Sequence, residues 1–325
     1  MGKIHRTLTV LAVAIAGGAG AALLVRANAV RNLSSLTIAV LSPYVAVLAV
    51  AGMAAAAASR RRVLAVVAML VAIISVGVQV SWYYLGRPRD PGNDSIVRLL
   101  SSNIRNGEAD ATAFVRTAEA NADVLVVIEL TPDAVQRFSS AGINRIFPYS
   151  HLIPAPLAGG IGMWSRFPIA PLPVPKHPFA AVPAALISIP DVPVEMVLVG
   201  VHVKSPLAEG RDTIDDWHSG IEHVRNRLTA FAKNAGAGAV VVAGDFNATP
   251  DVRQLRDMLT DGYRDAVEQL GAGFSPTFPA NRWYPPLYTI DHVFTRNSAA
   301  VVIKTVNIAG SDHRGLLASI AVPPG

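Results

Sequence analysis

The chain has 325 residues, of which 51% are hydrophobic and only 16% are charged, and its mean hydropathy is +0.39. Soluble domains usually contain about 25% charged residues, so part of this chain is predicted to lie outside water. A composition this apolar excludes an intrinsically disordered chain. The absence of cysteine excludes a disulfide scaffold and a thiolate metal site.

Charge is distributed unevenly along the chain. The first 94 residues carry nine basic and two acidic residues, whereas the rest carries 19 basic and 21 acidic residues. A nucleic-acid-binding domain is expected to have a basic surface, and the larger part of this chain is slightly acidic. The basic excess lies beside the apolar segments, where membrane topology would place it.

Three uncharged segments near the N-terminus are each long enough to cross a bilayer as a helix. They span residues 7–25, 33–59 and 63–85, and about 20 apolar residues are sufficient for a crossing. We therefore predict three transmembrane helices within residues 1–86, with the small residues at 17–20 and 54–58 as candidate packing faces. A cleavable signal peptide is the alternative for the first segment, but the other two segments keep the protein in the membrane under either reading.

The positive-inside rule predicts the orientation of these helices. The basic residues before the first segment and the arginines at 60–62 are expected on the cytoplasmic side, which makes the protein a multi-pass protein of the cell membrane with an extracytoplasmic C-terminal domain. Trp82, Tyr83 and Tyr84 close the third segment as an interfacial aromatic belt. Residues 87–95, rich in Gly, Pro and charge, are predicted to be a linker.

From residue 96 the pattern changes to short apolar runs of strand length, separated by turn residues and by a few longer helical segments. The expected strands are 96–100, 124–128, 161–164, 184–189, 194–201, 239–243, 290–295, 299–306 and 316–322. The expected helices are 109–120, 132–139, 213–235 and 252–260. This pattern predicts one α/β (α+β) domain over residues 96–325, with two β-sheets packed together and flanked by helices.

Polar residues cluster at the ends of the expected strands. They are Asn103, Glu129, His202, Asp245, Asn247, Asp291, Asp312 and His313. Carboxylate and amide oxygens suit magnesium, with manganese as an alternative, whereas a zinc site would need more closely spaced histidines. Together they predict metal-assisted hydrolysis of a phosphate ester. Each residue alone also has a structural interpretation, as a turn residue, a helix-terminus charge, an ion-pair partner or a buried histidine.

Four motifs occur in the order that one family uses. Residues 160–168 read Gly-Ile-Gly-Met-Trp-Ser-Arg-Phe-Pro, residues 244–247 read Gly-Asp-Phe-Asn, the segment 275–293 leads to Ile-Asp-His-Val, and residues 311–313 read Ser-Asp-His. Over about residues 96–322 the chain therefore resembles the endonuclease/exonuclease/phosphatase superfamily, which includes DNase I-like and neutral sphingomyelinase-like enzymes. The resemblance is to its membrane-anchored bacterial branch, and it implies a four-layer DNase I-like sandwich.

The resemblance implies roles for the acidic and amide residues. Glu129 would be the main metal ligand, with Asn103 beside it and Asp312 as a further metal contact. Asp245 would orient and deprotonate the attacking water, and Asn247 would hold that water or a phosphate oxygen.

It also implies roles for the basic residues. His313 would contact the scissile phosphate or act as acid and base, and Asp291 would fix the orientation of its ring. His202 would donate a hydrogen bond to the phosphate or a proton to the leaving oxygen. Lys204 and Arg166 are the candidate cations for the substrate phosphate.

The combined expectation is a membrane-anchored, magnesium-dependent phosphodiesterase acting on a lipid head group or an envelope phosphate. An anchored nuclease acting on DNA or RNA is the first alternative, and a catalytically silent receptor for a phosphorylated ligand is the second. No protein partner is predicted. The aromatic and Pro-rich segment 277–288 is either a lip for substrate or lipid, or an ordered surface loop. His292 is expected to pack inside the domain rather than to reach the site.

Overall fold

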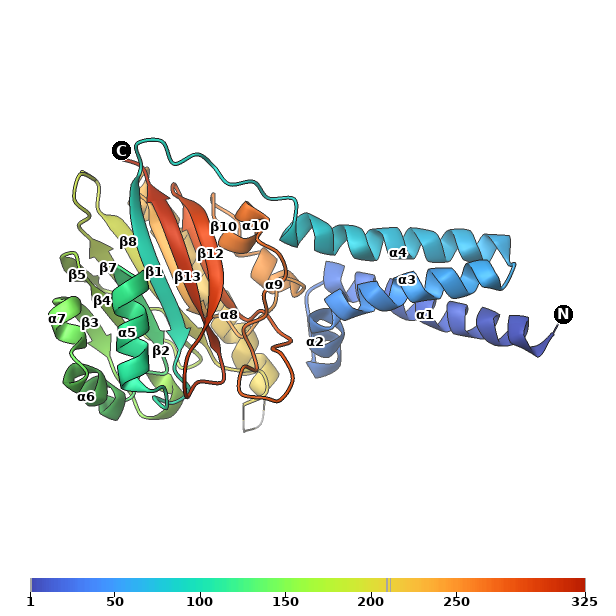
Figure 1. The fold of residues 1–325 in the computed structure, drawn as a ribbon, viewed down its shortest axis with the longest axis horizontal. Coiled ribbons are helices and arrows are strands. Elements are labelled where there is room, and N and C mark those ends of the chain that lie inside the picture. Colours follow the sequence, from blue (N-terminus) through green and yellow to red (C-terminus); the bar gives the residue numbers. More distant parts are fainter. Residues whose placement is uncertain (1, 209, 211, 325) are drawn as a thin grey trace. The chain divides into compact units, whose positions relative to one another are not determined.

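The computed structural model describes residues 2–208, 210 and 212–324, and it separates into two compact units. One unit is helical; it ends at Leu85 and also includes the segment Pro250–Arg256. The other unit comprises Gly86–Thr249 and the chain from Asp257 onward, and it contains both β-sheets (Figure 1).

The helical unit contains α1 (Lys3–Ala27), α2 (Leu33–Val40), α3 (Ser42–Ala58), α4 (Arg62–Tyr83) and the single turn α9 (Arg253–Arg256). Among the helices that the structure describes, α1 and α4 are the two that are each long and apolar enough, by length and composition, to cross a membrane. The segment expected as one span over residues 33–59 is instead the pair α2 and α3, bent by 65°. Pro43 lies in the first turn of α3, and because proline has no N–H and clashes with the preceding turn it interrupts the helix there. The expectation of three uninterrupted spans is corrected to two, or three if the bent pair counts as one.

The helices of this unit pack through small side chains. Ala12, Ala16, Ala56 and Ala68 form one buried cluster, and Ala19, Ala49 and Ala72 form another. The large aliphatic side chains point outward, for example Val47, Val63 and Ile73. This distribution is the reverse of that in a soluble bundle, and it is typical of helices that pack in lipid. The glycines at 17, 18 and 20 have open space around them, so the alanines are the packing face.

A polar cluster lies within the same unit. One carboxylate oxygen of Asp251 accepts hydrogen bonds from Arg26 Nε at 2.7 Å and from Gln79 Nε2 at 2.8 Å. Gln79 also donates to the hydroxyl of Ser42 at 3.2 Å. The helix expected over residues 252–260 is only the single turn α9, and Asp251 just before it pairs with Arg26 of α1.

The second unit has a six-stranded and a seven-stranded mixed sheet. The first sheet has the order β12 (Ala299–Asn307), β13 (Arg314–Val322), β1 (Ser95–Asn103), β2 (Val124–Ile128), β4 (Ile161–Ser165) and β3 (Tyr149–Ile153). The second has the order β10 (Arg264–Asp265), β11 (Asp291–Arg296), β9 (Val240–Asp245), β8 (Met196–Val203), β7 (Ala184–Ile187) and β5 (Ile169–Leu172), with β6 (Ala180–Ala181) pairing β8. Only β1–β2 and β8–β9 pair in parallel among these strands.

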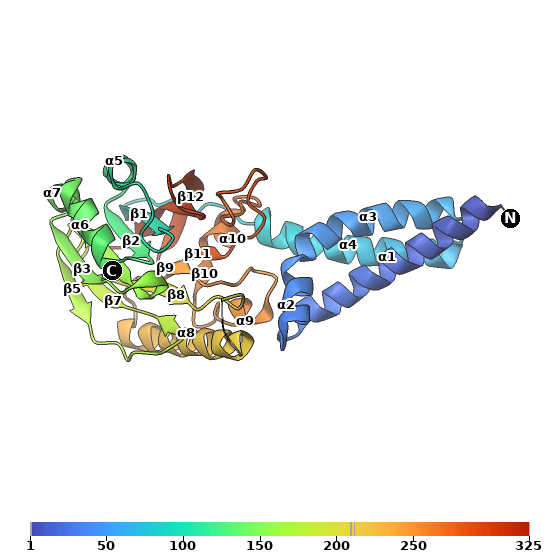
Figure 2. The same cartoon turned by 90° about the horizontal axis from the view of Figure 1, so that it is seen from below.

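Helices cover both outer faces of the sheet pair, which gives four layers (Figure 2). The inner core lies between the sheets and includes Val126 and Leu198. Outside the first sheet lie α5 (Ala111–Asn121), α6 (Pro132–Ser140) and α7 (Ile143–Ile146), and Phe114 of α5 stacks on Phe138 of α6. Outside the second sheet lies α8 (Thr213–Ala235), which buries Trp217 and other side chains of one face. Two short elements, η1 (Leu157–Gly159) and α10 (Ala266–Leu270), lie in connections.

The expectation of two packed sheets flanked by helices is confirmed. All nine expected strands are present, each within a few residues of its expected bounds. The strands that the sequence did not indicate are β3, β5, and the two-residue strands β6 and β10.

Candidate active site

The two parallel strand pairs place their carboxyl ends at one edge of the sandwich. Asn103 ends β1 and pairs in register with Ile128, so Glu129 follows immediately on the neighbouring strand. In the second sheet, His202 of β8 is opposite Asp245 of β9. The antiparallel strands β11 and β13 begin at this edge, which brings Asp291 opposite Asp245 and puts His313 directly before Arg314. Strand direction therefore gathers residues that lie up to 210 positions apart in the sequence.

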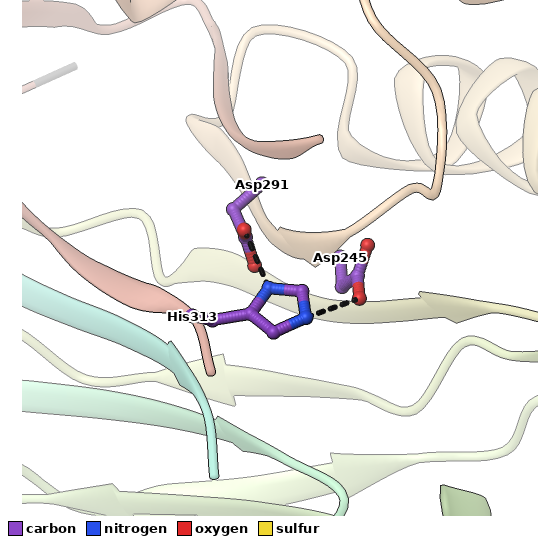
Figure 3. A group of neighbouring side chains, drawn as sticks. All are labelled: Asp245, Asp291 and His313. Carbon is purple, nitrogen blue, oxygen red and sulfur yellow. Dashed lines mark hydrogen bonds and ion pairs between the residues drawn. The ribbon is translucent and has the colours of Figure 1, made fainter. Parts of the chain in front are cut away.

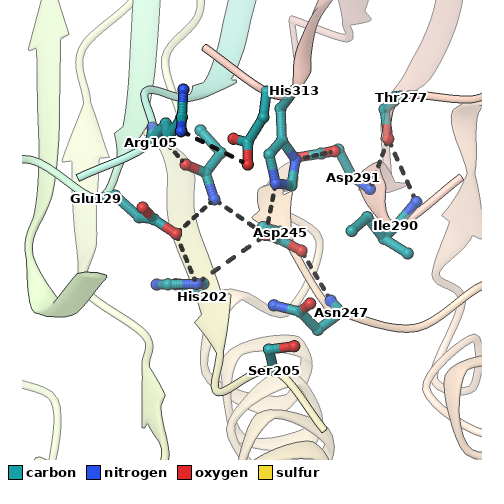
Figure 4. A network of polar contacts seen from close by, with 12 residues as sticks. Arg105, Glu129, His202, Ser205, Asp245, Asn247, Thr277, Ile290, Asp291 and His313 are labelled. Atoms are coloured by element: carbon teal, nitrogen blue, oxygen red, sulfur yellow. Dashed lines mark hydrogen bonds and ion pairs between the residues drawn. The ribbon is translucent and has the colours of Figure 1, made fainter. Parts of the chain in front are cut away.

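Asp245 is the centre of the cluster (Figure 4). Its Oδ2 accepts a hydrogen bond from Asn103 Nδ2 at 3.1 Å, and it lies 3.8 Å from His313 Nε2 and 4.0 Å from His202 Nε2. Its Oδ1 accepts from the backbone N–H of Asn247 at 2.8 Å. A single buried carboxylate is therefore flanked by two imidazole nitrogens and one amide.

His313 is held by Asp291 (Figure 3). Its Nδ1 donates to Asp291 Oδ2 at 2.9 Å, so its Nε2 faces Asp245. The ring of Phe278 packs against the imidazole at 4.8 Å between centroids. A carboxylate on Nδ1 fixes the ring orientation and stabilises the imidazolium, as in other histidine sites that transfer protons.

The electrostatics of the cluster separate the pKa values of its members. Burial, together with the charge of Asp291, raises the pKa of Asp245 to about 6, although both histidines oppose the rise. Burial opposes ionisation of His313, but the charge and hydrogen bond of Asp291 outweigh it and raise the pKa of His313 to about 10. At neutral pH the site therefore holds a carboxylate that can accept a proton beside an imidazolium that can donate one.

On the first sheet, Glu129 and Asn103 are bonded to each other. Asn103 Nδ2 donates to Glu129 Oε1 at 2.9 Å, while Asn103 Oδ1 accepts from the N–H of Arg105. The second oxygen of Glu129 accepts from the N–H of Asn106 at 2.6 Å. His202 donates from Nδ1 to the carbonyl of Ala158, so its Nε2 faces Glu129 at 3.8 Å.

Asp312 and Arg105 lie at the more exposed side of the cluster. The Nε of Arg105 is 3.9 Å from Asp312 Oδ2, and another nitrogen of Arg105 pairs with Glu108. Burial raises the pKa of Asp312, and the charge of Glu129 acts in the same direction. Arg105 was not predicted as a site residue; it follows Asn103 by two positions in the turn that leaves β1, and no feature of its own singles it out.

The arrangement fits a hard divalent cation. The cluster contains the carboxylates of Glu129, Asp245 and Asp312, and oxygen ligands are what magnesium prefers. Asp245, Asp291 and His313 also offer ligand atoms that all lie within 4.8 Å of one another. Asp291 Oδ1 is buried and has no hydrogen-bond partner among the residues that the structure describes, so the site has an unsatisfied oxygen of the kind that a cation binds.

The two predicted phosphate-binding cations have different outcomes. Lys204 lies two residues after His202, and both line a cavity of about 200 Å³; its ammonium pairs with Asp216 at 2.6 Å. Arg166 does not reach the site. It follows β4, which is antiparallel to β2, so it lies at the end of the sheet where β2 begins, and there it donates to backbone carbonyls of Ala122 and Glu119.

Two further polar groups support the site. The side-chain amide of Asn247 donates to the backbone carbonyl of Val203, and the backbone carbonyl of Asn247 accepts from the indole N–H of Trp217. Ser311 donates to the carbonyl of Asn103 at 2.7 Å and accepts from the N–H of His313 at 3.0 Å. Ser311 was not predicted as a site residue, although its place in the Ser-Asp-His motif was a signal that could have identified it.

Comparison with known proteins agrees with this geometry. Residues 90–313, more than half of the chain, match the model of the endonuclease/exonuclease/phosphatase family. No curated protein matches the chain in sequence.

Solved structures share the fold. D. rerio TDP2 complexed with single-strand DNA product has a TM-score of 0.55 at 17% identity, over 70% of this chain and 100% of that one. Sphingomyelinase C from Streptomyces griseocarneus has a TM-score of 0.51 at 18% identity, over 69% and 99%. An endonuclease/exonuclease/phosphatase family protein from Bacteroides thetaiotaomicron has a TM-score of 0.52 at 12% identity, over 71% and 99%. The strand order, the polar cluster and the family match agree with one another. The chain therefore belongs to the endonuclease/exonuclease/phosphatase family, whose members are generally metal-dependent phosphoester hydrolases.

Proposed function

We propose that this protein is a membrane-anchored, magnesium-dependent phosphodiesterase that hydrolyses a lipid head group or another phosphodiester of the cell envelope. One observation carries the proposal: the buried carboxylate of Asp245 lies between the Nε2 atoms of His202 and His313. Attack by water on a phosphodiester needs a base for the proton of the water and donors for the phosphate and the leaving oxygen. This carboxylate and its two imidazoles can supply both.

The reaction assigns a proton to each of these groups. Asp245 accepts a proton from the attacking water, whose oxygen forms the new bond to phosphorus. His313 donates a hydrogen bond from Nε2–H to a non-bridging phosphate oxygen, in a ring orientation that Asp291 maintains. As the bond to the leaving oxygen breaks, His202 delivers a proton from Nε2 to that oxygen, so the products are a phosphomonoester and an alcohol. Asn247 holds the attacking water or a phosphate oxygen.

We assign the metal to Glu129, with Asn103 and Asp312 beside it. A bound magnesium would neutralise charge on the phosphate and polarise phosphorus. Asn103 presents its N–H₂ to Glu129 and its oxygen to the backbone, so binding through the amide oxygen requires the Asn103 side chain to turn. In the neighbouring group of Asp245, Asp291 and His313, the imidazole bonds Asp291 and is a nitrogen donor, whereas magnesium prefers oxygen ligands such as the carboxylate of Glu129. We infer that Lys204, at the wall of the cavity beside His202, contacts the substrate phosphate.

A lipid or envelope substrate is favoured over duplex DNA for two reasons. From residue 95 onward the chain has two more acidic than basic residues, whereas binding of a nucleic-acid backbone relies on many cationic contacts. In addition, the segment between Phe278 and Tyr288, which pair with each other beside His313, presents Trp283 with 95% of its surface exposed. Indole rings are favoured at the boundary between lipid and water.

The first test is hydrolysis by the detergent-purified full-length protein. The panel comprises bis-p-nitrophenyl phosphate, phospholipid vesicles that include sphingomyelin, and plasmid DNA, each with magnesium and with EDTA. We expect magnesium-dependent hydrolysis that Asp245→Asn abolishes and that Asp133→Asn, which removes one exposed carboxylate from α6, leaves unchanged. Activity that persists in EDTA or in Asp245→Asn contradicts the mechanism.

The same panel separates the alternatives. Cleavage of plasmid DNA that falls steeply as salt rises, with intact phospholipid, indicates the nuclease. Absence of turnover on every substrate indicates the receptor. For the lipid assignment, Trp283→Ser should lower hydrolysis of vesicles more than hydrolysis of the soluble substrate, whereas Val194→Ser should not. Val194 is a matched exposed apolar residue that precedes β8, at the opposite end of that strand from His202.

Membrane anchoring and the extracytoplasmic position of the catalytic unit are part of the proposal. The outward-facing aliphatic side chains of α1, α3 and α4 and the arginines at 60–62 support them. Because the chain has no cysteine, one cysteine introduced at exposed Lys176 gives a background-free probe. We expect an impermeant maleimide to label it in intact cells, and labelling only after lysis would reverse the orientation.

A further inference from the structure

His292 is a fully buried histidine next to the active site that the proposed mechanism does not use. It follows Asp291 on β11, so its side chain points to the opposite face of the strand from the His313 partner. Its ring packs in a cluster with two aromatic side chains, with Phe246 edge-on at 5.6 Å and Phe294 at 5.8 Å. The expectation that it packs inside the domain is met, but both of its ring nitrogens also have polar partners.

Both of those partners are hydrogen-bond acceptors. Nδ1 lies 2.8 Å from Asp265 Oδ2, and Nε2 lies 2.9 Å from the carbonyl oxygen of Ala248. A carbonyl can only accept, so Nε2 carries a proton. The other oxygen of Asp265 accepts from the backbone N–H groups of Val267 and Glu268 at the start of α10.

The electrostatic environment of His292 favours the protonated ring. Burial disfavours the charged ring, but the hydrogen bond and the charge of Asp265 outweigh it, and the pKa of His292 is raised. The pair has 1% side-chain exposure on each partner, so no water competes for these hydrogen bonds. A buried ion pair of this kind contributes more to the specificity of a local geometry than to net stability.

Ala248 belongs to the turn that carries the water-activating carboxylate. The chain leaves β9 at Asp245 and turns sharply, with Asn247 in the left-handed region at φ 47°. A non-glycine residue in this region is strained and keeps its conformation only where its surroundings hold it. The turn is held at Phe246 by the carbonyl of Ile290, and at Ala248 by His292.

We infer that His292 is a positioning residue for the reaction: by donating a hydrogen bond from Nε2 to the Ala248 carbonyl, it holds the turn of residues 245–248 and with it the carboxylate of Asp245. This inference rests on the proposed function. One strand end then sets both halves of the proton-transfer chemistry, because Asp291 orients His313 on one face while His292 fixes the base-bearing turn on the other.

Two variants separate the grip on Ala248 from the buried charge. In Asp265→Ser the hydroxyl can still cap α10, the carboxylate beside His292 Nδ1 is gone, and His292 can keep its Nε2–H on Ala248. In the double variant Asp265→Ser/His292→Phe, no buried charge remains and an aromatic ring still fills the space, but the donor to Ala248 is lost. The double variant therefore avoids the unpaired buried carboxylate that could prevent His292→Phe alone from folding.

The measurements are steady-state kinetics on bis-p-nitrophenyl phosphate and amide hydrogen exchange of the full-length protein in detergent. We expect the double variant to lose about tenfold or more in kcat with KM nearly unchanged, because a small displacement of a catalytic group is costly. Asp265→Ser should stay within about threefold of wild type. Hydrogen exchange should accelerate in the peptide covering residues 244–249 of the double variant and not in the sheet core.

Either of two results overturns the inference: a double variant with wild-type kcat, or unchanged exchange in residues 244–249. If wild type is inactive on every substrate, the proposed function fails, but the exchange measurement still decides whether His292 holds the turn. The two failures are therefore distinguishable.

Discussion

Replacing Asp291 by asparagine should move the whole pH profile of activity toward acid. Asn keeps the size of the side chain and can accept the hydrogen bond from His313 Nδ1, so the variant removes the charge and little else. Asp291 is 3% exposed, and one of its oxygens has no hydrogen-bond partner among the described residues, so its charge acts strongly on both of its neighbours.

The alkaline limb of the profile reports the imidazolium of His313. Although burial opposes protonation, the charge of Asp291 is the largest influence that raises this pKa, and the result is about 10. The rise of about 3.5 above an ordinary histidine corresponds to about 5 kcal/mol in favour of the imidazolium. If Asp291 supplies roughly half of it, the limb moves from about 10 to about 8, since kcat/KM falls as pH rises through this pKa.

The acid limb reports the carboxylate of Asp245. Burial raises its pKa and the charge of Asp291 adds to the rise, which together bring it to about 6. Activity grows as pH increases through this value, because the base must be ionised. Removing the charge of Asp291 lowers the pKa of Asp245, so the acid limb also moves to lower pH.

Stability gives an independent check with its own sign. A raised histidine pKa stabilises the fold fully below pH 6.5, and the contribution is lost as pH rises through about 10. Through His313 alone, Asp291→Asn should therefore lower the free energy of unfolding by about 2–3 kcal/mol near pH 6, and this deficit should shrink as pH rises from about 8 to about 10.

The assay is kcat/KM for bis-p-nitrophenyl phosphate across pH 4.5–11 (roughly the range needed to bracket both values), combined with urea unfolding at both ends. Asp133→Asn, which changes an exposed carboxylate, is the control. Limbs that stay within about half a pH unit of wild type, or that move in opposite directions, would refute the argument that one charge sets both pKa values.

Three further outcomes follow from the structure. Gly244→Ala should prevent folding of the catalytic unit or cost more than about 3 kcal/mol, since a Cβ would lie 1.9 Å from the carbonyl of Val201 at φ +151°; expression yield and melting temperature test this. Asp251→Ala should destabilise the helical unit by about 3 kcal/mol, because Arg26 loses its buried partner, and thermal unfolding in detergent measures the loss. Excess magnesium should raise the melting temperature of the wild type and have a much smaller effect on Glu129→Gln, and an equal rise in both would move the metal away from Glu129.

The sequence was sufficient for the residues whose position depends only on the end of an apolar run. Glu129 follows a five-residue buried strand and Asp245 ends another, so each could be placed at a sheet edge without knowing strand order. Arg166 follows a buried strand too, and by the same reasoning it was assigned to the site. The direction of its strand is what differs, because β4 runs antiparallel to β2. Strand direction is a tertiary property that no local pattern carries.

The helical segments illustrate the same limit. A hydropathy pattern measures length and polarity, so residues 33–59 were assigned as one span, yet Pro43 makes them two helices. The pattern also could not tell which small residues pack. The glycines at 17, 18 and 20 were as plausible a packing face as the alanines. In the structure the alanines form the buried clusters between helices, whereas these three glycines have open space around them.

Backbone strain adds information that side-chain type does not. Glu129, Asn247 and Arg105 each adopt a left-handed conformation within two residues of the end of a strand that ends at the site, with φ of 62°, 47° and 50°. Each such residue costs of order 1–3 kcal/mol unless its surroundings enforce it, and such residues concentrate where function requires a particular direction of the side chain. At Glu129 the chain turns just beyond β2. The carboxylate of Glu129 then accepts hydrogen bonds from the side-chain amide of Asn103 and the backbone N–H of Asn106. The strained turns at these three positions and the hydrogen bond from His292 to Ala248 have the same consequence: they hold acidic side chains close together against their mutual repulsion. Such proximity is the condition for binding a cation and for raising the pKa of a carboxylate that acts as a base.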